Sequence, residues 1–121
     1  MVTFQFQNSY RTTVWVVGIF YDPPDCTGYG NWMIRGWWEI EPGQTVAAFE
    51  STNQYAGYYA EAADGSYWAG SYGPYLVTNS VISLCYDNRP APPNFAVGMR
   101  LINANPPWWA AWWNYTVNLT A

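Results

Sequence analysis

The sequence predicts an all-β domain, an antiparallel β-sandwich of about seven to nine short strands. Three observations predict it. Apolar and polar residues alternate with a period of two along several segments. Those segments are rich in β-branched and aromatic residues, and Pro, Gly, Asn and Asp separate them at short intervals. No segment keeps a helical period over eleven residues. The length of 121 residues fits a single domain, 1–121.

The first half of the chain contains four predicted strands. Alternation near the N-terminus puts Phe4 and Phe6 on one face of a short strand. Residues 22–31 are dense in Pro and Gly, which predicts a loop. Pro42 and Gly43 suit the central positions of a type II turn, because Gly supplies the positive φ there. The predicted strands of this half are 3–7, 12–21, 32–40 and 45–50.

The second half contains the remaining predicted strands, of which the last closes the domain. Asp64 and Gly65 form a hairpin signal between two aromatic-rich segments. A second loop rich in Pro covers residues 87–94. The predicted strands of this half are 55–63, 66–70, 75–86, 95–103 and 115–120.

Charge is scarce in this chain, and its sign limits the possible partners. Only 10% of the residues are charged, against roughly a quarter in an ordinary globular domain. There is no Lys, and four arginines face eight acids, which gives a net charge of -4. This balance argues against nucleic acid, because phosphate binding needs a basic stripe. An anionic membrane is disfavoured for the same reason, whereas a neutral glycan or a zwitterionic headgroup is not repelled.

The absence of His narrows the chemistry further. It excludes Ser-His and Cys-His nucleophilic sites and His-containing zinc sites. Nothing in the spacing of the carboxylates indicates that two of them converge as glycoside hydrolysis requires. We therefore expect a protein that is not an enzyme and that uses no metal or cofactor. Alternation places Glu61 on a buried or semi-buried face, where Arg35 or Arg100 is the expected partner.

The two cysteines and the N-terminus bear on the compartment. Cys26 and Cys85 either form one disulfide in an oxidising compartment or remain free thiols. The N-terminal MVTFQFQNS has neither the basic region nor the apolar run of a signal peptide, so a signal is either lacking or already removed. No stretch approaches the ~20 apolar residues of a transmembrane helix.

Several motifs occur in a recognisable order. A Phe and an Asn lie on the first strand, a Gly-Trp-Trp precedes the Pro-Gly turn, and a Tyr-Tyr-x-Ala-Glu strand precedes a Trp-x-Gly. Over about residues 4–103 this order resembles the bacterial family DUF1036. The resemblance implies a small, often secreted or envelope-associated β domain of undefined activity, and it favours an extracellular or cell-surface location. Thr45 stands where that family usually has Cys, and residues 75–77 lack another expected Cys, so the family's disulfides are not transferred.

Four tryptophans lie within six residues near the C-terminus, in the segment WWAAWW. In a strand or in a helical turn, Trp108 pairs with Trp112 and Trp109 pairs with Trp113, and the two pairs point different ways. Because one core readily buries one pair, we expect the other pair to be partly exposed. The alternative is that all four are core residues. Residues 109–114 also resemble the aromatic lipid-headgroup segment of actinoporin-type toxins.

A second aromatic concentration surrounds the predicted hairpin at residue 64. Tyr55, Tyr67 and Tyr72 are candidate contact residues, whereas ordinary cross-strand packing is favoured for Tyr59 and Trp68. The leading hypothesis is a module that binds a neutral glycan or cell-surface component through exposed Trp and Tyr. The alternatives are a self-assembling subunit, or a protein that binds membrane headgroups through its Trp cluster. The candidate ligand-binding residues are Trp108, Trp109, Trp112, Trp113, Tyr55, Tyr67 and Tyr72.

Overall fold

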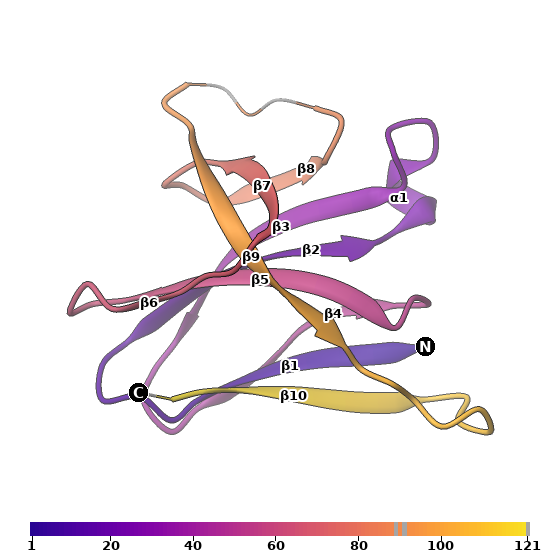
Figure 1. Cartoon of the computed structure of the whole chain (residues 1–121), viewed down its shortest axis with the longest axis horizontal. Coiled ribbons are helices and arrows are strands. Elements are labelled where there is room, and N and C mark those ends of the chain that lie inside the picture. The colour runs from indigo at the N-terminus through magenta and orange to yellow at the C-terminus, as the bar shows by residue number, and fades with distance from the viewer. Residues whose placement is uncertain (89, 91, 121) are drawn as a thin grey trace.

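The computed structural model describes residues 1–88, 90 and 92–120 of the chain. Across these residues the chain forms ten strands and one short helix, arranged as two sheets (Figure 1). The elements are β1 (Val2–Asn8), β2 (Val14–Tyr21), α1 (Pro23–Cys26), β3 (Trp32–Ile40), β4 (Thr45–Ser51), β5 (Tyr55–Ala62), β6 (Tyr67–Trp68), β7 (Tyr72–Val77), β8 (Ile82–Cys85), β9 (Phe95–Asn103) and β10 (Trp113–Leu119).

The small sheet has the order β10-β1-β4. β4 runs antiparallel to β1, whereas β10 runs parallel to it, with Val2 beside Trp113 and Asn8 beside Leu119. The predicted antiparallel sandwich is confirmed apart from this one pair. The parallel pair arises because β9 ends at Asn103, at the end of the sandwich where β1 begins, so the chain enters β10 beside the start of β1.

The large sheet has the order β7-β9-β5-β2-β3-β8, with β6 added to β5. It is curled into a half-barrel. Its two edge strands, β7 and β8, are consecutive in the chain and are joined by residues 78–81. The indole Nε1 of Trp37 on β3 donates to the Thr78 carbonyl oxygen at 2.7 Å. This bond fixes the connection between the two edge strands against β3, the neighbour of β8.

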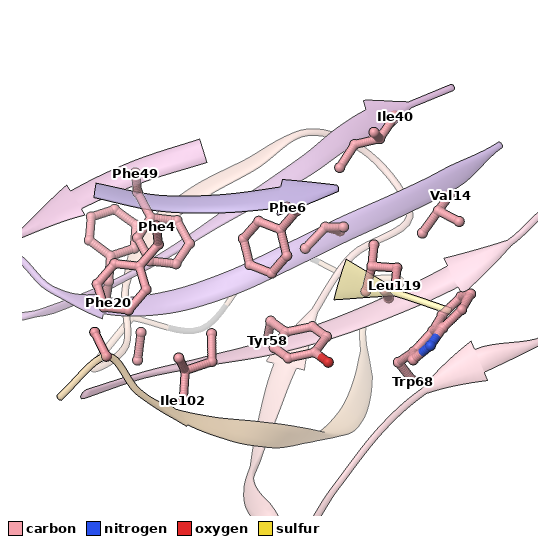
Figure 2. Close-up of a cluster of buried hydrophobic side chains, with 14 of the residues drawn as sticks. Phe4, Phe6, Val14, Phe20, Ile40, Phe49, Tyr58, Trp68, Ile102 and Leu119 are labelled. Carbon is pink, nitrogen blue, oxygen red and sulfur yellow. The ribbon is translucent and has the colours of Figure 1, made fainter. Parts of the chain in front are cut away.

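The main core lies between the two sheets, and aromatic rings dominate it (Figure 2). The rings of Phe20 and Phe49 stack at 4.4 Å with an interplanar angle of 7°, and so join the large sheet to the small one. Phe6 meets Tyr58 edge to face at 5.3 Å. Such ring pairs add about 0.5–1.5 kcal/mol each beyond the apolar area that they bury.

A second core lies on the other face of the large sheet, inside the half-barrel. Both faces of β2 are therefore buried, which explains why its sequence is almost continuously apolar. Val16 and Phe20 face the main core, whereas Val17 and Ile19 face the second core. The buried residues of this second core are Val17, Ile19, Ile34, Val77, Ile82, Val97 and Met99.

Two expectations about local structure are corrected. Residues 22–31, expected as a loop, begin with the short helix α1, which supplies Cys26. The strand predicted over 75–86 is two strands, because the chain turns at 78–81, where the Val81 side chain is exposed. The predicted turn at Pro42 and Gly43 is present, with φ of 84° at Gly43.

Candidate functional site

The strand registers bring several segments together at one end of the sandwich. β2 ends where β3 begins, with Tyr21 beside Trp32, and β5 begins where β9 ends, with Tyr55 beside Asn103. The hydroxyl of Ser51, at the end of β4, donates to the Tyr21 carbonyl oxygen at 2.8 Å and ties the small sheet to the large one. We call this the aromatic end; it lies on the right in Figure 1.

Exposed apolar side chains concentrate at the aromatic end. Ten large apolar side chains are exposed among the described residues, and all of them except Tyr67 and Val81 lie there. Single exposed apolar residues are normal on a protein surface, whereas a gathered set indicates a contact surface. The members at the aromatic end are Met1, Tyr29, Tyr55, Tyr86, Leu101, Trp108, Trp109 and Trp112.

Residues 104–112, which we call the tryptophan loop, connect β9 to β10 at this end. The exposed fractions of Trp108, Trp109 and Trp112 are 95%, 68% and 71%. The segment from residue 101 to the C-terminus contains no charged residue. The loop therefore presents three indoles to solvent and contains no charged side chain, although the N-terminal ammonium of Met1 donates to the Ala111 carbonyl oxygen at 3.0 Å.

The expected division into two Trp pairs is not found. Three of the four tryptophans are exposed, and only Trp113 packs against the main core, where its Nε1 donates to the Ala104 carbonyl oxygen at 3.2 Å. The reason is that residues 108–112 are neither a strand nor a helix. The Pro107 carbonyl oxygen accepts from the Ala110 amide at 3.0 Å in a tight turn, so the spacing of a regular element does not apply.

An aromatic pocket of about 250 Å³ lies elsewhere at the aromatic end. Tyr72 meets Tyr75 edge to face at 5.6 Å. Burial, and then the hydrogen bond with Tyr72, raises the pKa of Tyr75 well above its usual value, so Tyr75 keeps its hydroxyl proton. The disulfide between Cys26 and Cys85 holds α1 beside the end of β8. The pocket is lined by Ile19, Gly30, Trp32, Tyr72, Tyr75 and Tyr86.

The opposite end of the sandwich holds Glu61 and Tyr67, and here an expectation is corrected. Glu61 is exposed, and its partner is the Tyr59 hydroxyl, which donates to it at 2.6 Å. The expected arginines bond elsewhere: Arg35 donates to the Ser83 hydroxyl and Arg100 to the Ala69 carbonyl oxygen. Solvent reaches Glu61 near the end of β5, so the carboxylate does not need a buried ion pair.

Comparison of the chain with family models, curated proteins and solved structures finds no match. The resemblance to DUF1036 therefore stays a prediction. In residues 1–88, 90 and 92–120, the structure has no helix that is long and apolar enough to span a membrane. In the same residues, no three His, Cys, Asp or Glu side chains are placed to hold a metal ion together.

The seven candidate ligand-binding residues fall into separate places. Tyr55 lies at the aromatic end with the tryptophan loop, Tyr72 lines the aromatic pocket, and Tyr67 lies at the opposite end beside Glu61. Sequence reasoning missed Trp32 as a pocket residue. The strand-loop-strand pattern of residues 12–40 predicts a hairpin, which could have placed Trp32 near Tyr21. The approach of Tyr72, Tyr75 and Tyr86 to Trp32 leaves no pattern in the local sequence.

Proposed function

We propose that this domain is a non-enzymatic binding module that attaches to the interface of a zwitterionic membrane through the tryptophan loop. The observation that carries the proposal is the exposure of Trp108, Trp109 and Trp112 on one uncharged loop. An indole combines a large apolar body with one N–H donor, and Trp is enriched at the boundary between lipid and water for that reason. Insertion of the loop would remove three indoles from water at once.

The charge of the domain favours the zwitterionic surface. Surface-binding proteins that recognise anionic lipids use clusters of Lys and Arg. This chain has a net charge of -4 and no Lys, and the tryptophan loop adds no charge. Binding therefore relies on indole insertion, and anionic lipid should weaken it.

Vesicle sedimentation tests the proposal. We expect the wild-type protein to pellet with phosphatidylcholine vesicles, and brominated acyl chains to quench its fluorescence. Replacement of Trp108, Trp109 and Trp112 by Ala together should lower the apparent affinity by about tenfold or more, which corresponds to only about 1.4 kcal/mol. Unfolding free energy should change by less than about 0.5 kcal/mol, because these side chains are exposed.

A matched control uses Tyr67 and Val81, which among the described residues are the large exposed apolar side chains away from the aromatic end. The variant with Tyr67→Ala and Val81→Ala should pellet like the wild type, since both side chains are exposed but lie elsewhere. A wild-type protein that stays in the supernatant would refute membrane attachment, and so would equal binding by the loop variant. Growth in particle mass with concentration, without vesicles, would indicate self-association through the same indoles.

The aromatic pocket favours a second candidate function, recognition of a neutral glycan. Trp32, Tyr72 and Tyr86 offer flat apolar faces, and the two tyrosines add hydroxyls that can bond to sugar hydroxyls. A glycan array probed with the wild-type protein tests this candidate. Hits that Tyr72→Ala abolishes and that the loop variant retains would assign recognition to the pocket, and an array without hits would remove it.

A further inference from the structure

A recess at the opposite end of the sandwich has a different chemistry from the aromatic end. Trp15 on β2 lies between two acidic neighbours, Glu61 on β5 and Glu39 on β3. Side chains that are paired across neighbouring strands share a face, and their Cβ atoms lie about 4.5–5.5 Å apart. The two carboxylates therefore flank the same half-buried indole.

The recess has a volume of about 190 Å³ and is lined by Trp15, Trp37, Glu61 and Asn79. The ring of Trp37 is fixed twice. Its Nε1 donates to the Thr78 carbonyl oxygen at 2.7 Å. The ring also packs edge to face with Tyr59, with the ring centroids 6.0 Å apart and an interplanar angle of 76°. Because that N–H is already used, Trp37 offers a ligand only its π surface.

Glu61 is held in place as a carboxylate acceptor. The Tyr59 hydroxyl donates to its Oε1 at 2.6 Å. Burial, and then this hydrogen bond, raises the pKa of Tyr59 well above its usual value of 10.0, so Tyr59 stays a donor at neutral and mildly alkaline pH. Among the described residues, Oε2 of Glu61 has no hydrogen-bond partner.

Within the part of the chain that the structure describes, neither Glu39 nor Glu61 forms an ion pair. Arg11 pairs with Asp64 instead. Arg89 lies outside the described residues. A recess with indole walls and carboxylates attracts a cation and offers it aromatic surface.

We propose that this recess binds a small organic cation of the quaternary ammonium class. Such a cation has no N–H group that needs a hydrogen-bond partner, and its attraction to indole faces grows as water is removed. Glu61 supplies the opposite charge at the recess, and Glu39 adds to the local negative potential. A calcium ion is a poorer match, because it takes six to eight oxygen ligands and two of the four lining residues are tryptophans.

Isothermal titration with choline tests the proposal. The reference compound is 3,3-dimethyl-1-butanol, which has the shape of choline but carries no charge. We expect saturable choline binding and at least about tenfold weaker binding of the neutral compound. Glu61→Gln should weaken choline binding by about tenfold, since it removes the charge and keeps the shape. Trp15→Phe should weaken it several-fold, because Trp is the strongest cation–π partner.

The control variant is Glu50→Gln, which removes an exposed carboxylate on the small sheet. It should leave choline affinity unchanged. Equal binding of the neutral compound would overturn the proposal, as would unaltered affinity in Glu61→Gln or an equal loss in Glu50→Gln. The triple Ala variant of the tryptophan loop should retain choline binding, so failure of membrane attachment and failure of this site are distinguishable.

Discussion

At the scale of single residues, Asp64 shows how an exposed carboxylate organises a turn. Its Oδ2 accepts from the Tyr10 hydroxyl at 2.5 Å and from Arg11 at 2.9 Å, while its Oδ1 accepts from the Ser66 amide at 3.0 Å. These bonds connect the hairpin between β5 and β6 to the segment between β1 and β2. The hydrogen bond from Tyr10, followed by that from the Ser66 amide, lowers the pKa of Asp64 to about 2.

This shift predicts a pH dependence of stability. A carboxyl group with a lowered folded-state pKa stabilises the fold above its unfolded pKa, here 3.8, and loses that contribution as the pH falls toward 2. We expect Asp64→Asn to be less stable than the wild type at pH 7 and to show a smaller decline of Tm between pH 4 and pH 2. Parallel Tm curves for the two proteins over this range would contradict the assignment.

Residue-level prediction from the sequence succeeded where a role is set locally, by a residue and its neighbours in the chain. The turn at Gly43 is one such case, because glycine adopts the positive φ that the turn requires. It failed for Glu61, whose expected arginine partners bond elsewhere. Alternation gives the face of a strand to which a side chain belongs, but it does not give the solvent access of that face.

At the scale of elements, Asn8 joins the ends of several strands. It is fully buried at the end of β1. Its Nδ2 donates to the carbonyl oxygens of Thr12 and Ile40 at 2.8 and 2.9 Å, and its Oδ1 accepts from the Tyr10 amide at 2.8 Å. The side chain thereby connects β1, the start of β2 and the end of β3.

Loss of this connection should be costly. Asn8→Ala leaves two carbonyl oxygens and one amide without their partner, and each such group costs about 1–3 kcal/mol when buried. Allowing for water entry, we expect a loss of about 2–4 kcal/mol in urea unfolding. The control is Asn118→Ala on β10, where the same change affects an exposed side chain and should cost less than about 0.5 kcal/mol. Similar losses in both variants would refute the role of Asn8.

Most strands were predictable because a buried face leaves a period of two in the sequence. Residues 3–7 and 32–40 correspond closely to β1 and β3. The boundary between β7 and β8 was missed, because residues 78–81 carry neither Pro nor Gly and the only turn signal there is Thr78-Asn79-Ser80 between two apolar segments. The orientation of β10 depends on where β9 ends in space, which no local pattern records.

At the scale of the whole molecule, one disulfide links distant parts of the chain. Cys26 and Cys85 are 59 residues apart in sequence and join α1 to the end of β8. The sequence left the choice between a disulfide and two thiols open, because two cysteines alone do not report their distance. The pairing of β8 with β3, which puts Cys85 beside Met33, brings Cys85 to the end of β3 that α1 precedes.

Removal of this link should destabilise the entire fold. Closure of a loop of this length restricts the unfolded chain by about 4 kcal/mol in the chain-entropy model. We expect the double variant Cys26→Ala and Cys85→Ala to lose free energy of unfolding of that order in urea. A reducing agent should shift the wild type toward the variant and leave the variant unchanged. Equal stability of oxidised and reduced wild type would show that the link contributes nothing.

β5 runs between the two surfaces proposed for binding, with Tyr55 near one and Glu61 near the other. Six residue steps along a strand amount to about 20 Å. A molecule anchored by its indoles would therefore carry the acidic recess well clear of the lipid headgroups, facing the surrounding solution. Anchorage and cation capture would then proceed side by side without competition, and the domain would act as a short rigid spacer that displays one ligand above a surface.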